Sequence, residues 1–169
     1  EEQNRVLIDH LAELCFAPTD AAVSHLLREG IAAERIVQTG DVMADAARLF
    51  GEEAEQRAIE LMTSAGLKEM ADGDKFFVLA TIHRAENTDD PVRLEAILNA
   101  LATFAIKGVD GHGPVPVLLP LHPRTKARIN TYELQHLLEP LTLTSPIGFM
   151  AMVLLERRAS LVVTDSGGV

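Results

Sequence analysis

The sequence predicts an α/β protein with doubly wound parallel sheets. Short apolar runs of strand length alternate with longer segments in which apolar residues recur at helical spacing. This alternation is typical of parallel sheets covered by helices. The chain has 169 residues, 47% of them hydrophobic, which is enough to form a real core and excludes a disordered chain.

The first part of the chain is predicted to contain two short strands among three helices. Thr19 is a preferred N-cap residue and Gly30 a preferred residue after a helix C-terminus, so a helix is expected between them. A longer helix is expected further on, with a break at Gly51. The expected elements are helices at residues 4–14, 19–30 and 43–65 and strands at residues 15–17 and 35–38.

The second part is predicted to contain four strands alternating with helices. Asp90 and Pro91 suit the N-cap and first turn of a helix. Helical spacing continues after them at Leu94, Ile97, Leu98, Leu101 and Phe104. The expected elements are strands at residues 76–81, 115–119, 141–143 and 160–164, and helices from Asp90 onward, at residues 124–130 and at residues 149–157.

A polar connection at residues 66–74 is the best candidate for a domain boundary. The two strands before it are too few for an independent sheet domain. We therefore expect residues 1–65 to form the end of a first Rossmann-like domain with a connecting helix. Residues 66–74 are the expected linker, and residues 75–169 the larger part of a second Rossmann-like domain.

The most informative motif is Thr164-Asp165-Ser166-Gly167-Gly168, which follows an apolar run. Adjacent glycines allow backbone N–H groups to approach a ligand closely, and the serine adds a hydroxyl donor. A turn of this kind at a strand end suits a phosphate or diphosphate. The alternative is a plain glycine-rich turn between a strand and a loop.

Two further strand ends carry cationic or imidazole side chains. His83 and Arg84 follow the strand expected at residues 76–81, and His122 and Arg124 follow the next one. Parallel strands would bring these ends and the Ser-Gly-Gly turn to one edge of the sheet, where open α/β sheets bind ligands. For Arg84 the alternative is a solvated loop in which it pairs with Glu86.

Composition excludes several classes of function. The net charge of −10 argues against a nucleic-acid partner. No apolar run approaches the roughly 20 residues that span a bilayer, so no membrane association is expected. Cys15 is the single cysteine, and we expect a core residue in a reducing, cytoplasmic setting. No histidines have metal-ligand spacing, so we expect no metal.

Six short stretches of sequence follow one another in an order that indicates a family. They are residues 1–5 (EEQNR), 15–20 (CFAPTD) with 27–30 (LREG), 39–42 (TGDV), 81–87 (TIHRAEN), 122–125 (HPRT) and 164–168 (TDSGG). Along nearly its whole length the chain resembles the UDP-N-acetylglucosamine 2-epimerases of the bacterial non-hydrolysing branch. Asp41 departs from the asparagine usual at that position.

The resemblance implies a fold and an activity. Two Rossmann-like domains in the glycosyltransferase-B arrangement are implied, both incomplete in this chain. The implied reaction is reversible epimerisation at C2 of UDP-N-acetylglucosamine to UDP-N-acetylmannosamine, by elimination and re-addition of UDP. It needs no cofactor. The resemblance also implies a homodimer for the full-length protein, and we expect these 169 residues alone to be inactive.

The resemblance also implies roles for particular residues. Glu1, Arg5 and His83 are the implied catalytic residues, the first two on one helix face at i, i+4 and turned toward a cleft shared with the third. The implied substrate-binding residues are Arg84, Ile147, Met152, Ser166, Gly167 and Gly168. From the residues alone, a surface ion pair is favoured for Glu1 and Arg5, and Met152 is most simply a helix-core residue.

Two other functions fit the same motifs. A glycosyltransferase of the same architecture would share the glycine turn but transfer the sugar to an acceptor. A non-catalytic UDP-binding fragment would share the turn and carry out no chemistry. The segment at residues 81–87 argues against the glycosyltransferase, whereas the binding fragment stays open.

Overall fold

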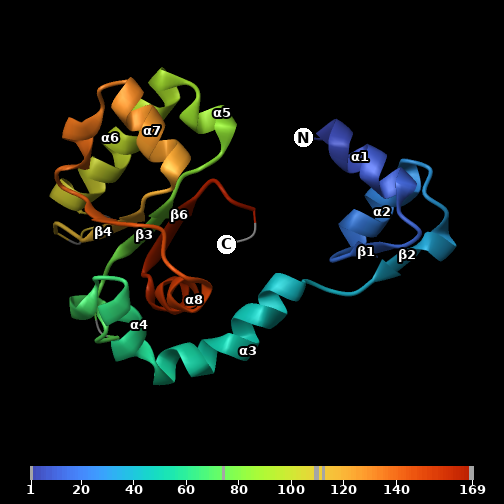
Figure 1. Ribbon diagram of the computed structural model, residues 1–169, viewed down its shortest axis with the longest axis horizontal. Coiled ribbons are helices and arrows are strands. Elements are labelled where there is room, and N and C mark those ends of the chain that lie inside the picture. Colours follow the sequence, from blue (N-terminus) through green and yellow to red (C-terminus); the bar gives the residue numbers. More distant parts are fainter. Residues whose placement is uncertain (1, 74, 109–110, 112, 168–169) are drawn as a thin grey trace. The chain divides into compact units, whose positions relative to one another are not determined.

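The computed structural model describes residues 2–73, 75–108, 111 and 113–167. It divides into two compact units, Glu1–Leu49 and Phe50–Val169 (Figure 1). Each unit contains a parallel β-sheet, of two strands in the first and four in the second. The predicted α/β class with parallel sheets is therefore confirmed.

The first unit is a small βα arrangement. Its elements are α1 (Glu2–Leu11), β1 (Cys15–Ala17), α2 (Asp20–Arg28), the 3₁₀ helix η1 (Ala33–Arg35) and β2 (Ile36–Gln38). The strands pair in parallel with Cys15 opposite Ile36, and Thr19 caps α2 by accepting from the backbone N–H of Ala22. Cys15 is buried beside Leu26, as the sequence predicted for a core cysteine.

The long helix expected at residues 43–65 is two helices, α3 (Val42–Gln56) and α4 (Ala58–Ser64). The break lies at Arg57, so the prediction of a break at Gly51 was wrong. Gly51 is buried inside α3, where a Cβ would come 2.5 Å from Nη1 of Arg157. The glycine therefore makes room for a neighbouring side chain and does not end the helix.

The predicted domain ranges of 1–65, 66–74 and 75–169 stay a prediction, whereas the two compact units divide between Leu49 and Phe50. Residues 66–73 of the predicted linker are described by the structure. The segment contains the 3₁₀ helix η2 (Lys68–Met70), with Leu67 and Met70 buried. Its polarity in sequence concealed these two core residues.

The second unit is built on a sheet of strand order β5-β4-β3-β6, all parallel. The strands are β3 (Val78–Thr81), β4 (Val117–Pro120), β5 (Thr142–Thr144) and β6 (Leu161–Thr164). The helices that follow β3 along the chain are α5 (Ala85–Thr88), α6 (Pro91–Lys107), α7 (Pro123–Thr131), η3 (Gln135–Leu138) and α8 (Phe149–Arg158). All four strands predicted for this part are present.

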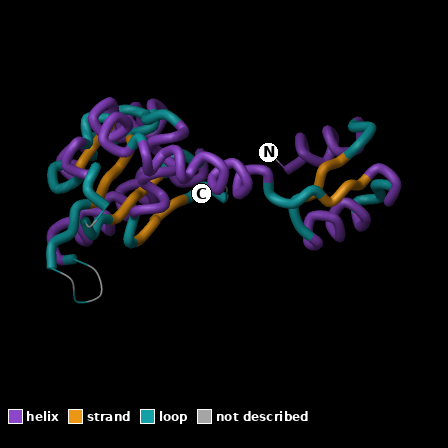
Figure 2. Tube along the Cα trace, turned by 90° about the horizontal axis from the view of Figure 1, so that it is seen from below, coloured by secondary structure: helices purple, strands orange, loops and turns teal. Residues whose placement is uncertain are grey.

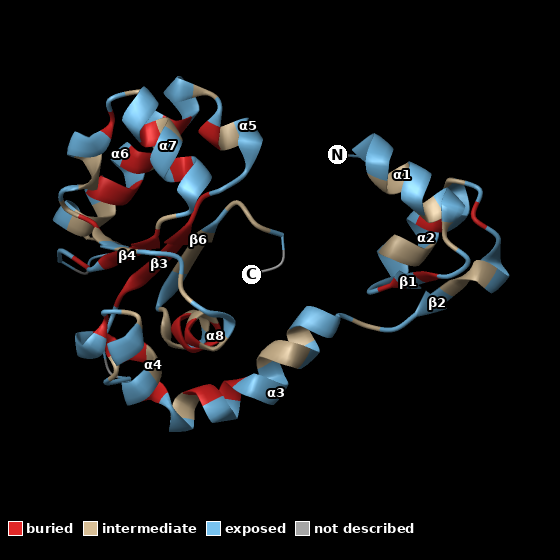
Figure 3. Cartoon of the chain, in the orientation of Figure 1, coloured by how far each residue is buried: buried red, intermediate tan, exposed pale blue. Residues whose placement is uncertain are grey.

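Helices cover both faces of this sheet, as Figures 1 and 2 show from two directions. Val78 and Ala80 pack with α6 residues such as Leu98, whereas Leu79 packs with Leu154 of α8 on the opposite face. Successive side chains of a strand point to opposite faces, which explains this division. Central strands β3 and β4 are consequently buried along their whole length (Figure 3).

One buried hydrogen bond joins α7 to the end of β3. Thr125 is fully buried, and its hydroxyl donates to the backbone carbonyl of Ile82 over 2.6 Å. Ile82 immediately precedes His83, so this bond fixes the backbone where the strand opens into its loop. No described helix is long and apolar enough to cross a membrane.

We expect Thr125→Val to lower the free energy of unfolding by about 1–3 kcal/mol, because the buried Ile82 carbonyl loses its hydroxyl donor. Chemical denaturation measures the change. The matched control is Thr103→Val, whose exposed hydroxyl bonds within α6 to Asn99; it should cost less than about 0.5 kcal/mol. Equal losses in the two variants would show that the Thr125 bond does not stabilise the fold.

Candidate functional site

The carboxyl ends of neighbouring strands β4, β3 and β6 lie at one edge of the second unit's sheet, because all three strands are parallel. His83 and Arg84 follow β3, His122 follows β4, and Ser166 and Gly167 follow β6. The convergence that the sequence predicted for these three strand ends is present. Gly168 lies outside the described residues.

Asp165 connects the loop after β3 to the loop after β6. Its carboxylate accepts the backbone N–H groups of His83 (3.1 and 3.2 Å) and Arg84 (2.9 Å) and the side-chain amide of Asn87 (3.1 Å). Burial alone would raise the pKa of the Asp165 carboxyl, but these hydrogen bonds together hold it below its usual value. Asp165 is therefore ionised at neutral pH.

A threonine pair supports the same two loops. The hydroxyls of Thr81 and Thr164 lie 2.7 Å apart across strands β3 and β6. The Thr164 hydroxyl also accepts the backbone N–H of Ser166 over 2.9 Å. The Thr164 hydroxyl and the Asp165 carboxylate thus hold the start of the Ser-Gly turn against the end of β3.

Arg84 lies over the glycine turn. A Cβ placed on Gly167 would lie 3.7 Å from Nη2 of the Arg84 guanidinium. The alternative pairing with Glu86 is present but long, at 3.9 Å between Nη1 and Oε1, and both side chains are exposed. An exposed pair at this distance contributes little, so the guanidinium can still bind an anion at the turn.

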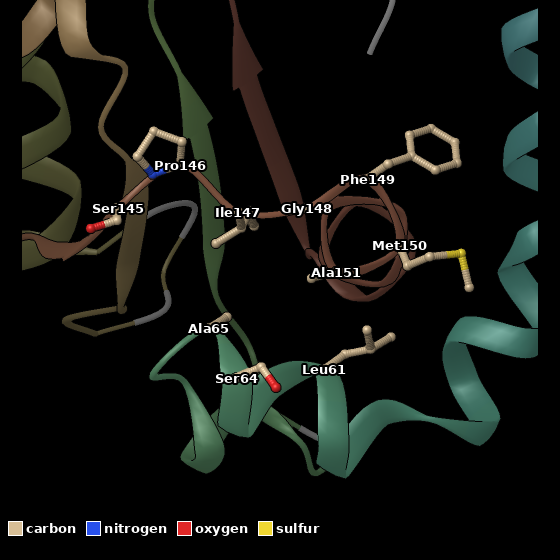
Figure 4. A pocket seen from close by; sticks show the side chains of 10 residues that line it. All are labelled: Leu61, Ser64, Ala65, Ser145, Pro146, Ile147, Gly148, Phe149, Met150 and Ala151. Carbon is tan, nitrogen blue, oxygen red and sulfur yellow. The ribbon is translucent and has the colours of Figure 1, made fainter.

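Two neighbouring cavities share Pro146 and Ile147, and the smaller one adjoins the loop after β3. One, of about 200 Å³, is lined by Thr81, Ile82, His83, Pro120, His122, Pro146, Ile147, Met152 and Glu156. The other, of about 400 Å³, lies between the end of α4 and the start of α8; Figure 4 shows all ten of its lining residues. We call the first the histidine pocket. His83, Ile147 and Met152 all line it.

Two histidines line the histidine pocket with their rings 6.0 Å apart between centroids. His83 Nδ1 lies 3.4 Å from Oδ1 of Asp165. His122 is the N-cap residue of α7, and its Nδ1 accepts the backbone N–H of Arg124 over 3.2 Å. Each ring is therefore oriented by a partner outside the pocket.

Sequence reasoning missed Asp165, Asn87 and Glu156 as site residues. Glu156 lines the histidine pocket, and partial burial raises the pKa of its carboxyl. A signal for it existed, because Met152 and Glu156 lie four residues apart and so share one face of α8. Asp165 and Asn87 stand within the motifs at residues 164–168 and 81–87, but no local pattern indicates their contact, because they lie 78 positions apart in sequence.

Arg5 belongs to the first unit, where three carboxylates surround it. Its guanidinium pairs with Glu2 at 2.8 Å, with Asp9 at 2.5 Å and with Glu29 at 2.5 Å. The hydrogen bonds to Glu2 and Glu29 raise the pKa of Arg5 further. Glu1, its predicted partner, lies outside the described residues, and the shared cleft with the second unit stays a prediction.

No group of three or more His, Cys, Asp and Glu side chains that could hold a metal ion occurs among the residues that the structure describes. The chemistry that the described site offers comes from a guanidinium, two imidazoles, a hydroxyl, the Glu156 carboxyl and backbone N–H groups. These groups bind anions and hydroxyls.

Comparisons with known proteins identify the family. The model of the family "UDP-N-acetylglucosamine 2-epimerase" matches residues 1–169. The UDP-2,3-diacetamido-2,3-dideoxy-D-glucuronate 2-epimerase of Pseudomonas aeruginosa is 43% identical over 171 residues, covering 100% of this chain and 43% of that protein. A UDP-N-acetylglucosamine 2-epimerase of Methanococcus maripaludis is 35% identical, over 99% of this chain and 44% of that protein.

Solved structures agree with the sequence comparisons. The Methanocaldococcus jannaschii UDP-GlcNAc 2-epimerase in complex with UDP-GlcNAc and UDP matches with a TM-score of 0.82 and 32% identity, over 99% of this chain and 44% of that one. The chain thus spans less than half the length of the relatives it matches. With the family model matching throughout, the chain belongs to the UDP-N-acetylglucosamine 2-epimerase family.

Proposed function

We propose that the full-length protein reversibly inverts C2 of a UDP-2-acetamido sugar, with UDP-N-acetylglucosamine and UDP-N-acetylmannosamine as the pair. A base removes the C2 proton, the C1–O bond breaks, UDP departs, and the sugar becomes a glycal. UDP then adds back at C1, and a proton returns to the other face of C2. This chemistry requires UDP to stay bound between the two steps and its growing charge to be stabilised.

The convergence of Arg84, Ser166 and Gly167 on one sheet edge is the observation that carries this proposal. Asp165 occupies the backbone N–H groups of His83 and Arg84, so these donors are already taken. The diphosphate is therefore bound by the Arg84 guanidinium, the Ser166 hydroxyl and the backbone of the glycine turn, including Gly168. Guanidinium groups bind phosphates with two N–H donors at once.

The remaining roles follow from position in the histidine pocket and from the resemblance. His83 donates to the diphosphate as UDP departs, while Ile147 and Met152 contact the uracil. Glu1 and Arg5 act from the first unit, and the three carboxylates around Arg5 support a role in which it anchors α1. In this proposal residues 1–65 are the end of a first Rossmann-like domain with a connecting helix, residues 66–74 are the linker, and residues 75–169 are the larger part of a second Rossmann-like domain.

A second substrate is favoured by one comparison. The Pseudomonas aeruginosa relative is named for UDP-2,3-diacetamido-2,3-dideoxy-D-glucuronate and is more identical to this chain, at 43%, than the Methanococcus maripaludis relative, at 35%. Compared with UDP-N-acetylglucosamine, that substrate carries an additional acetamido group and a carboxylate, whereas the UDP and the C2 centre that is inverted are the same. Assays should therefore include both sugars.

The full-length protein is incubated with each UDP-sugar in deuterated water, and the C2 proton is followed by ¹H NMR. We expect solvent deuterium to replace the proton at C2. An epimerase exchanges this proton because the elimination removes it. A glycosyltransferase would leave C2 untouched and require an acceptor, and a binding protein would do neither. The 169-residue chain alone should show no exchange, since the carboxylates expected in the rest of the first domain are absent; exchange by it would contradict this assignment.

We expect Gly167→Ala to fold normally but to bind UDP at least about tenfold more weakly, or about 1.4 kcal/mol. Among the residues that the structure describes, the added methyl meets Arg84 alone, at 3.7 Å, so the protein itself accommodates it, whereas a bound diphosphate would be displaced. Isothermal titration calorimetry measures the change. Gly113→Ala is the control, because a Cβ there contacts nothing. Unchanged UDP affinity in Gly167→Ala would remove the diphosphate from this turn.

Ser166→Ala and His83→Ala should affect different steps in the full-length enzyme. The Ser166 hydroxyl holds the diphosphate in substrate and transition state alike, so its loss should raise KM by the equivalent of about 1–3 kcal/mol. His83 meets charge that grows as UDP departs, so its loss should mainly lower kcat. Steady-state kinetics separates the two effects. A His83→Ala enzyme with unchanged kcat and raised KM would make His83 a binding residue only.

A further inference from the structure

The two rings of the histidine pocket have opposite kinds of partner at Nδ1. His83 Nδ1 faces a carboxylate oxygen of Asp165 at 3.4 Å. His122 Nδ1 faces the backbone N–H of Arg124 at 3.2 Å. In a neutral imidazole one nitrogen carries the proton and the other a lone pair, and the partner of one nitrogen decides which is which.

For His83 the partner is an acceptor. The Asp165 carboxylate is ionised and already accepts N–H groups from Arg84 and Asn87, so it has only lone pairs to present. A lone pair on Nδ1 would be repelled by this oxygen, whereas a proton on Nδ1 is attracted. His83 therefore carries its proton on Nδ1, and Nε2 is left as an acceptor for the pocket.

For His122 the partner is a donor. Residue 122 precedes the first turn of α7, where backbone N–H groups lack partners within the helix. The Arg124 N–H can only donate, so Nδ1 of His122 must present a lone pair. The proton of His122 is consequently on Nε2, which is left as a donor for the pocket.

We propose that Asp165 and the N-terminus of α7 fix opposite tautomers of the two histidines, and that Asp165 is the positioning residue of His83. The pocket then presents an acceptor, His83 Nε2, and a donor, His122 Nε2–H, on rings 6.0 Å apart. This assignment rests on the proposed function only in treating the histidine pocket as part of the UDP-sugar site.

The pair discriminates between two chemical groups of such a ligand. A sugar hydroxyl both donates and accepts, so it satisfies neutral His83 and His122 alike. A phosphate oxygen without a proton only accepts, so it matches neutral His122 but not neutral His83. His83 matches phosphate only after it gains a proton, and the Asp165 carboxylate then balances the positive charge. In its neutral form His122 is accordingly oriented to donate to a phosphate oxygen, whereas His83 can donate to one only when both of its ring nitrogens carry a proton.

The test is NMR of full-length protein labelled with ¹⁵N at histidine, at a pH where both rings are neutral. Two-bond ¹H–¹⁵N correlations distinguish a protonated ring nitrogen from one with a lone pair, and His83→Gln and His122→Gln assign the signals. We expect a protonated Nδ1 in His83 and a protonated Nε2 in His122. The same tautomer in both rings, or the reverse assignment, would overturn the proposal.

Asp165→Asn tests the positioning role against a merely structural one. The amide can still accept the Arg84 N–H, but its NH₂ group would face His83 Nδ1 and move the ring proton to Nε2. The control Asn87→Ala removes another Asp165 contact and should leave the tautomer of His83 unchanged. An unchanged tautomer in Asp165→Asn, or the same change in both variants, would overturn the positioning role.

Arg124→Pro provides an independent test at the other ring. Proline removes the backbone N–H that faces His122, whereas Arg124→Ala keeps it and loses only the ion pair with Asp89. A tautomer mixture at His122 is expected in the proline variant alone. These NMR measurements do not require turnover. An enzyme that shows the predicted tautomers but does not exchange deuterium at C2 would contradict the proposed function and still support the tautomer proposal.

Discussion

The site depends on one carboxylate that is held by two loops. Asp165 is only 11% exposed in its side chain and accepts N–H groups from His83, Arg84 and Asn87. Hydrogen bonds to an ionised acceptor are among the stronger ones in proteins, and leaving such a group unpaired is costly. Asp165 therefore holds the loop after β3 and the turn after β6 together. This contact fixes the positions of the His83 imidazole, the Arg84 guanidinium and the glycine turn relative to one another.

An internal anion in a site for an anionic ligand has consequences for the choice of ligand groups. Asp165 accepts hydrogen bonds from backbone N–H groups that could otherwise bind phosphate, and its negative charge disfavours a second negative group nearby. The site compensates with the Arg84 guanidinium, which lies close to Gly167. A fixed cation beside the glycine turn suits the proposed reaction, in which the negative charge on the leaving group increases.

Much of this arrangement could be predicted from the sequence because it depends on local pattern. The four strands of the second unit, the Asp90 cap and the convergence of three strand ends follow from apolar periodicity and from parallel pairing. The Asp165 contacts and the packing of Gly51 against Arg157 join residues far apart in sequence, and no local rule indicates them. Leu67 and Met70 are buried although they stand among polar residues in the sequence, so the local pattern did not indicate these two core positions.

A crystal structure of the full-length protein with UDP tests the central claim most directly. The account predicts diphosphate oxygens within hydrogen-bonding distance of the Arg84 guanidinium, the Ser166 hydroxyl and the backbone N–H of Gly167. Asp165 should still accept the N–H groups of His83 and Arg84 in that complex. A diphosphate that displaces the Asp165 carboxylate and takes those two N–H groups itself, or that binds away from this sheet edge, would contradict the account.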